Sequence, residues 1–170
     1  MKANQINKAS EFPLLEMNGI EYFQFEEDFI EKNVRCIPMI VRFKMDAAGI
    51  KLKLAEWSKF SVDERVELAV KPCQTEQEVF GYKNYLANLV IQRTGKPADE
   101  LTVNLHPAWA DIHIVPVQLN EKAKEFDWTI SQTQWASLTD LQRFALTKLY
   151  KPGHENKNFP KAMKEFGLDQ

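Results

Sequence analysis

The sequence is poor in the residues that build most recognisable catalytic and metal sites. It has only two cysteines, three histidines and six glycines in 170 residues. Two cysteines do not make a disulfide framework, and no His-Glu-x-x-His motif or closely spaced His/Cys pair predicts a zinc site. There is no Gly-rich phosphate loop and no Gly-x-Ser-x-Gly nucleophile motif. These absences favour a protein without catalytic activity, bound metal or cofactor.

Long apolar runs and an excess of one charge are absent as well. No apolar run approaches the ~20 residues that a membrane helix needs, and the polar start of the chain lacks the apolar stretch of a signal peptide. The formal net charge of −2 gives no overall attraction to nucleic acid or to an anionic membrane. We therefore expect a cytoplasmic protein that binds neither. Residues 1–20 are expected to form a polar tail, and residues 21–170 a single compact domain.

Helix start and stop signals predict an all-α fold. Capping boxes at Ser61, Thr75 and Thr139 open predicted helices that run to about residues 70, 94 and 149. Further helices are expected from Pro38 to about residue 48, from Pro116 to about residue 126, and after Phe159-Pro160.

Two stretches have no clear helical period. Residues 22–29 are aromatic and predict either a short helix or an extended arm, with Glu26 and Glu27 interpreted as a solvated face. Alternating apolar residues at 101, 103 and 105 make a short β-hairpin near residues 101–115 an option.

The sequence contains two similar halves, which align without gaps when Pro38 is placed on Pro116. Five identities align in 31 positions, namely Pro38/Pro116, Lys44/Lys122, Trp57/Trp135, Arg65/Arg143 and Leu68/Leu146. Ordinary residue frequencies give about two such matches by chance. Each half therefore predicts a helix beginning at Pro, a short segment bearing a Trp that anchors the core, and a capped helix. The alignment also favours a helix over a strand for residues 39–45. Two unrelated helical hairpins of similar pattern remain the alternative.

Two segments are candidates for binding. Arg35 and Cys36 precede the predicted helix start at Pro38, where the helix dipole favours anions and lowers the pKa of a thiol. This pair would suit a ligand bearing phosphate or sulfur, whereas a buried Cys beside a capping Arg is the simpler interpretation.

The second segment is a polar loop between the helix ending near residue 149 and the last short helix. It offers His154, Glu155, Asn156 and Asn158 as donors and acceptors for a protein or a polar cofactor. A solvated connection between two helices is the alternative.

Long runs of the sequence resemble the family of nitrate reductase-associated proteins. The first is Arg35-Cys36-Ile37-Pro38-Met39 with its flanking residues. The others are Trp135-x-x-Leu138, Gln142-Arg143-Phe144-Ala145-Leu146, Pro152-Gly153-His154-Glu155-Asn156 and Glu165-Phe166-Gly167-Leu168. The resemblance covers about residues 22–168, so only the tail lies outside it.

The resemblance implies an accessory role. Such proteins are typically encoded beside assimilatory nitrate reductase and molybdopterin-cofactor genes, mostly in cyanobacteria, and the family has no established catalytic residues to carry over. We expect a factor that binds the immature molybdenum-dependent nitrate reductase and assists cofactor insertion, with His154, Glu155 and Asn158 at its recognition edge. Arg35, Cys36 and Arg143 match further motif positions of the family. The alternative is a non-catalytic carrier or sensor of a small ligand or of molybdopterin.

Overall fold

The computed structural model describes residues 15–17, 20–26 and 37–170. These ranges contain eight α-helices, three short 3-10 helices and four short strands, so the predicted helical fold class is confirmed. The described residues fall into an N-terminal unit, Leu15–Asp111, and a C-terminal unit, Ile112–Gln170. Each unit is described by itself below.

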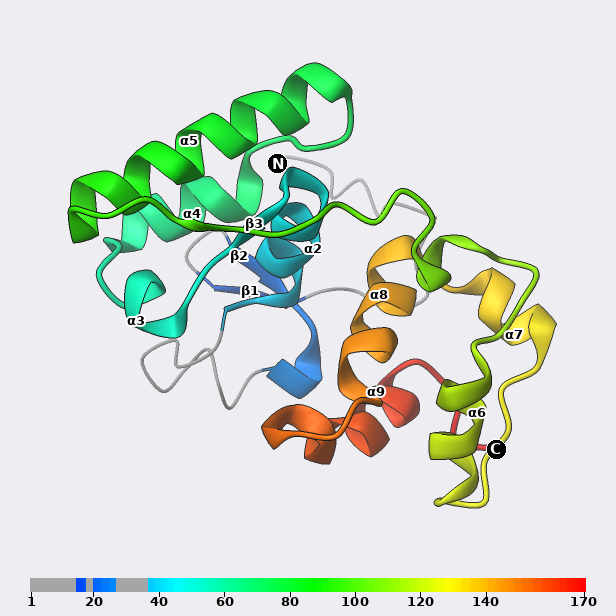
Figure 1. Ribbon diagram of the computed structural model, residues 1–170. Coiled ribbons are helices and arrows are strands. Elements are labelled where there is room, and N and C mark those ends of the chain that lie inside the picture. Colours follow the sequence, from blue (N-terminus) through cyan, green and yellow to red (C-terminus); the bar gives the residue numbers. More distant parts are fainter. Residues whose placement is uncertain (1–14, 18–19, 27–36) are drawn as a thin grey trace, which may run out of the picture. The chain divides into compact units, whose positions relative to one another are not determined.

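The N-terminal unit is built around helices α2 and α5. Its elements in order are β1 (Leu15–Met17), β2 (Ile20–Tyr22), η1 (Gln24–Glu26), α2 (Met39–Ala48), β3 (Ile50–Lys51), α3 (Leu54–Trp57), α4 (Val62–Val70), α5 (Glu76–Thr94), β4 (Asp99–Glu100) and η2 (Ala108–Ala110). The long helix α5 packs against α2 (Figure 1). Together with α4 they enclose the apolar core, which includes Val41, Met45, Leu68, Leu86 and Val90.

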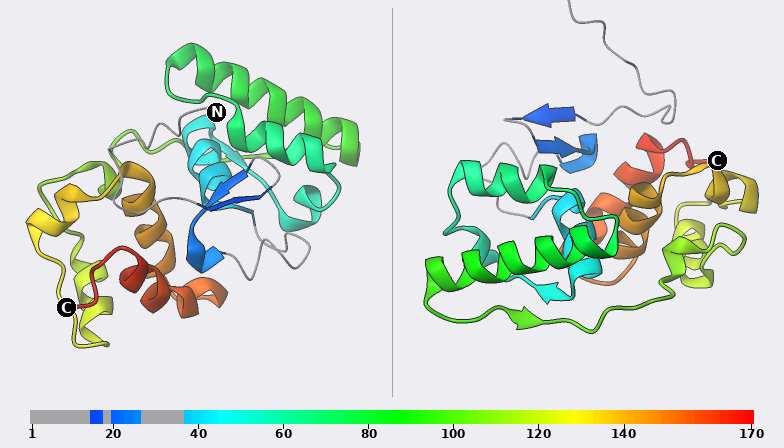
Figure 2. Two further views of the ribbon diagram at one scale, coloured as in Figure 1. Left: turned by 180° about the vertical axis from the view of Figure 1, so that it is seen from behind. Right: turned by 90° about the horizontal axis from the view of Figure 1, so that it is seen from above.

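Two small antiparallel pairs of strands complete this unit. Strands β1 and β2 lie side by side, with Leu15 opposite Tyr22, and appear as the blue arrows of Figure 2. Strands β3 and β4 pair with Ile50 opposite Glu100. Strand β1 and the start of β2 fall in the last part of the stretch expected to be a tail, and residues 1–14 lie outside the described residues.

The C-terminal unit is entirely helical within the described residues. It contains α6 (Val117–Lys124), α7 (Gln132–Ser137), α8 (Asp140–Leu149), η3 (His154–Asn158) and α9 (Phe159–Glu165). Helices α8 and α9 are in contact, and the buried residues include Leu119, Trp135, Phe144, Leu146 and Met163. The Thr129 N–H donates to the Gln170 carbonyl at 3.0 Å, which ties the last residue to the loop before α7.

Three helices of one unit correspond to three helices of the other, in the register that the sequence alignment predicts. Helices α2, α3 and α4 begin at residues 39, 54 and 62, and helices α6, α7 and α8 begin at 117, 132 and 140. Both units thus have a helix after Pro, a short Trp-bearing helix and a helix with a capping box, as the sequence predicts. Trp57 and Trp135 are both completely buried, which confirms their placement in the core.

The correspondence extends to a backbone feature at an aligned position where the residues differ. Gly49 and Asp127 occupy equivalent positions in the two units, and both have a left-handed backbone, with φ of 71° and 62°. Asp127 is the only non-glycine residue with positive φ among the described residues. At Gly49 a Cβ atom would lie 2.9 Å from the Leu101 carbonyl oxygen, so this position also lacks space for a side chain.

The hairpin considered near residues 101–115 is not formed. Strand β4 ends at Glu100 and pairs with β3, and residues 101–115 contain only the 3-10 turn η2. Residues 101–106, which we call the strap, continue β4 in an exposed path, and Leu105 has 81% of its surface exposed. The Leu101 N–H bonds the Gly49 carbonyl at 2.8 Å, and Trp109 packs against Phe43 of α2 at 5.1 Å between ring centroids. The alternating apolar residues at 101, 103 and 105 therefore belong to one extended segment, whose first residue is hydrogen-bonded to Gly49.

Glu26 is buried, which corrects its interpretation as part of a solvated face. Its carboxylate accepts the N–H groups of Phe23 at 2.9 Å and of Met39 at 2.8 Å. Met39 is the first residue of α2, and Pro38 before it supplies no side-chain cap. Glu26 therefore caps α2 from a separate element, η1, with its negative charge at the positive end of the helix. Of the aromatic stretch, Tyr22 ends β2 and Gln24–Glu26 form the short 3-10 helix η1, while residues 27–29 lie outside the described residues.

Candidate partner-binding segment

The polar segment between α8 and α9 is formed by a tight turn and the 3-10 helix η3. Helix α8 ends at Leu149, and Gly153 then adopts φ of 149° and ψ of −175°. This region of backbone conformation is essentially restricted to glycine. The segment then turns into η3, where the Asn156 N–H bonds the Gly153 carbonyl at 3.2 Å. Gly153 is therefore required by the turn, although its surroundings would leave room for a Cβ atom.

Asn156 holds this segment to the end of α8. Its Nδ2 atom donates to the carbonyls of Leu149 at 3.1 Å, Tyr150 at 3.2 Å and Lys151 at 3.2 Å. The last carbonyls of a helix have no partners within the helix, so these bonds satisfy groups that would otherwise need water. Asn156 thus has a structural part in shaping the segment.

Apolar side chains fix the C-terminal side of the segment. Phe159 and Met163 are completely buried, and Phe166 nearly so. The rings of Phe126 and Phe159 lie 6.2 Å apart, and the Leu168 N–H bonds the Met163 carbonyl at 2.8 Å. The segment is therefore held at both ends, by Asn156 at the end of α8 and by buried apolar residues at α9.

Asn158 departs from ordinary hydrogen-bonding rules. The residue is 3% exposed, and its Oδ1 atom has no hydrogen-bond partner within the described part of the chain. A buried unsatisfied polar atom costs about 1–3 kcal/mol. Local conflicts of this kind concentrate at functional sites. The burial also means that Asn158 presents little surface to a partner in this conformation.

Arg143 lies in the core of the C-terminal unit. Its guanidinium donates to the Leu138 carbonyl and to the Asp140 carboxylate, and lies 5.9 Å from the Trp135 ring centre. The residue is 3% exposed, so it supports the start of α8 and offers almost no surface for recognition.

The remaining predicted binding residues divide into two groups. Glu155 is half-buried in η3, in the same unit as Asn156 and Asn158. The backbone of His154 begins η3, but its side chain lies outside what the structure describes. Arg35 and Cys36 fall outside the described residues altogether. Their proposed roles in binding stay predictions.

Exposed lysines lie within and beside this segment, in addition to the residues predicted to bind a partner. Lys151, Lys157, Lys161 and Lys164 are all exposed. From Asp140 to Glu165 the chain has six basic and three acidic residues, a net charge of +3. The spacing of Lys157, Lys161 and Lys164 at i, i+4 and i+7 could have identified a basic helix face from sequence.

The described residues give little basis for thiol or metal chemistry. Burial raises the pKa of the Cys73 thiol, so it is a poorer nucleophile than an ordinary cysteine at neutral pH. No group of three or more His, Cys, Asp or Glu side chains in the described ranges is placed to hold a metal ion. Among the helices that the structure describes, none is long and apolar enough to cross a membrane.

Most of the chain matches a known protein family. Residues 22–166 match the sequence model of the family described as conserved nitrate reductase-associated protein. Because the match covers most of the chain, the protein belongs to this family, and the family association with nitrate reductase applies to it. No curated protein and no solved structure matches the chain.

Proposed function

We propose that this protein is a non-catalytic accessory factor for the maturation of a molybdenum-dependent assimilatory nitrate reductase. It binds the immature enzyme in the cytoplasm and assists insertion of the cofactor. The observation that carries this proposal is the family match over residues 22–166. The segment from α8 to α9 supports it, because a polar loop held by Asn156 and by the buried Phe159 offers a fixed surface for a partner.

The proposal distinguishes between two forms of the enzyme. A factor that acts before cofactor insertion has to release the enzyme once the cofactor is bound. It should therefore bind the cofactor-free form more tightly than the complete enzyme. A tagged copy of the protein, used as bait in extracts of nitrate-grown cells, should therefore enrich nitrate reductase that lacks its cofactor. A strain without the protein should contain the nitrate reductase polypeptide but little activity.

Two results would contradict this function. One is normal nitrate reductase activity in the deletion strain. The other is recovery of both enzyme forms in the proportion in which the extract contains them. A double variant His154→Ala/Glu155→Ala tests the loop, and full restoration of activity by it would exclude these two side chains from recognition.

A further inference from the structure

A row of exposed lysines runs along one side of η3 and α9. We call Lys157, Lys161 and Lys164 the lysine row. Lys161 and Lys164 lie three residues apart on α9 and so share one face of that helix, and Lys157 precedes them in η3. All three are exposed, while Phe159 and Met163 on the inner side are completely buried. The core contacts of α9 thus fix which face carries the lysines.

The charge of the lysine row contrasts with that of the rest of the chain. The stretch from Asp140 to Glu165 has six basic and three acidic residues and carries +3, and because the whole chain carries −2, all other residues together carry −5. Screening limits charge interactions to about 8 Å at physiological ionic strength. A partner that approaches this face therefore meets a locally positive surface on a protein that is acidic elsewhere.

The composition of this face favours a protein partner over a polyanion or a membrane. Phe144, Phe159 and Phe166 are buried and Tyr150 is half-buried, so the stretch offers little ring surface on which bases could stack. The single arginine of the stretch, Arg143, is buried and cannot grip a phosphate in the bidentate manner. The apolar residues of α9 face inward, so none is available to enter a bilayer.

We propose that the lysine row docks an acidic surface on a partner protein, which is the immature nitrate reductase if the proposed function holds. Complementary charge at the edge of an interface accelerates association and makes binding depend on salt. The contact orients the partner over the segment from Lys151 to Asn158, which shares Lys157 with the lysine row.

Charge reversal of the lysine row tests this inference. The variant Lys157→Glu/Lys161→Glu/Lys164→Glu is compared with a matched control, Lys51→Glu/Lys59→Glu/Lys96→Glu, which reverses three exposed lysines of the N-terminal unit. Binding of both full-length variants to purified cofactor-free nitrate reductase is measured at low and at physiological salt. Circular dichroism verifies that each variant retains its helices.

We expect the lysine-row variant to bind at least about tenfold more weakly and the control to stay within about threefold of the wild type. Wild-type binding should weaken as salt rises. Equal loss in both triple variants, or no loss in either, would overturn the lysine row as the docking surface and leave the proposed function intact.

Two further results separate the remaining explanations. Failure of the wild type to bind the enzyme at all would overturn the proposed function and the identity of the partner together. Tighter binding of the wild type to single-stranded DNA or to phosphatidylserine vesicles than to the enzyme, lost in the lysine-row variant, would replace the acidic protein by one of those polyanions.

Discussion

At the scale of single residues, an arginine and a tryptophan form the same pair in both units. Arg65 lies 5.4 Å from the Trp57 ring centre and donates to the Trp57 carbonyl at 3.2 Å. Arg143 lies over Trp135 in the same way but donates to the Leu138 carbonyl. Each pair joins the short Trp-bearing helix to the start of the following helix. The Trp and Arg that recur in the two halves of the sequence therefore form the same stabilising contact in each unit.

The two arginines should differ in their contribution to stability. The Arg143 side chain is almost completely buried, whereas Arg65 is half-buried. Removal of a buried hydrogen-bonded charge leaves its partners unsatisfied and costs more than removal of an exposed one. We expect Arg143→Ala to lower the free energy of unfolding by about 2–4 kcal/mol and Arg65→Ala by about 1 kcal/mol. Urea denaturation measures both.

Asp140→Ala provides the control for this pair. The Asp140 side chain is mostly exposed, so its ion pair with Arg143 should contribute less than about 1 kcal/mol. Equal losses for Arg65→Ala and Arg143→Ala would contradict the argument from burial. A large loss in Asp140→Ala would show that the ion pair, and not the hydrogen bond to the Leu138 carbonyl, accounts for most of the stability that Arg143 contributes.

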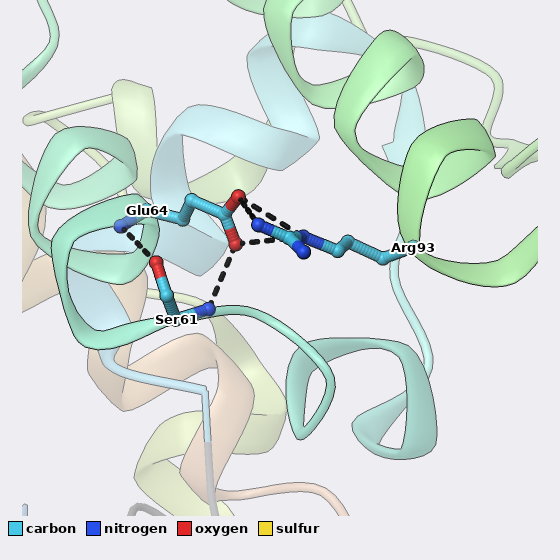
Figure 3. A network of polar contacts seen from close by, with 3 residues as sticks. All are labelled: Ser61, Glu64 and Arg93. Atoms are coloured by element: carbon cyan, nitrogen blue, oxygen red, sulfur yellow. Dashed lines mark hydrogen bonds and ion pairs between the residues drawn. The ribbon is translucent and has the colours of Figure 1, made fainter.

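At the scale of secondary-structure elements, the cap of α4 carries an additional ion pair. The Ser61 N–H donates to the Glu64 carboxylate at 2.7 Å, and the Glu64 N–H donates to the Ser61 hydroxyl at 3.2 Å (Figure 3). Arg93 near the end of α5 bonds the same carboxylate through Nε at 3.0 Å. The corresponding residue in α8 is Gln142, which keeps the cap without a charge.

Glu64→Gln should therefore remove the ion pair and keep the cap. The hydrogen bond from Arg93 is the main reason that the pKa of Glu64 lies below its ordinary value. A lowered pKa in the folded state means that the charge stabilises above the ordinary Glu pKa of about 4.3, and that this stabilisation is lost as pH falls further. We expect a loss of about 0.5–1 kcal/mol at pH 7 that fades below about pH 4.

Unfolding by urea at several pH values measures this difference. Glu64→Ala is the comparison, because it also removes the reciprocal bond of the cap and should cost about 1 kcal/mol more. A difference between wild type and Glu64→Gln that does not change with pH would exclude the ion pair as its cause.

Helices with local signals could be predicted, whereas elements that depend on distant partners could not. The capping boxes predicted the starts of α4, α5 and α8 because each box joins residues three positions apart. Strand β1 is short, and it pairs with a separate element, β2, rather than with residues of its own. Glu26 could not be recognised as a cap because its partner, Met39, lies in a different element and far along the chain.

The same distinction applies to the candidate segment. A loop with fixed ends could be predicted from Gly153, Phe159 and the apolar spacing of α9. The roles of Asn156 and Asn158 could not be predicted, because two identical side chains two residues apart lie in different surroundings. Asn156 donates to three carbonyls of the α8 end, and Asn158 is buried.

At the scale of the whole molecule, the strap belongs to the stretch of chain that connects the N-terminal unit to the C-terminal unit. Leu105 is 81% exposed, and no backbone N–H from Thr102 to Leu105 has a hydrogen bond to another described residue. Exposed backbone without such bonds is where proteases cut folded chains. The strap should therefore be the first site of cleavage within residues 37–170.

Chymotrypsin, which cuts after large apolar residues, should cleave there after Leu105. The products of this cut would be about 12 and 8 kDa from a chain of 19.8 kDa. Leu105→Thr removes the preferred residue and should slow the cut without changing the melting temperature, because the side chain makes little buried contact. A first cut inside α5 or α8 in mass spectrometry would contradict this prediction.

The shared left-handed position gives the two units different freedom to change over evolutionary time. Position 127 lies in a conformation that Asn, Asp and Gly all tolerate, and it holds Asp. Position 49 has the same backbone, but the Leu101 carbonyl of the strap's first residue occupies the space of a Cβ atom. Among relatives of this chain, residue 127 is therefore free to vary within a small set of residue types. Residue 49 has to remain glycine for as long as the strap crosses it.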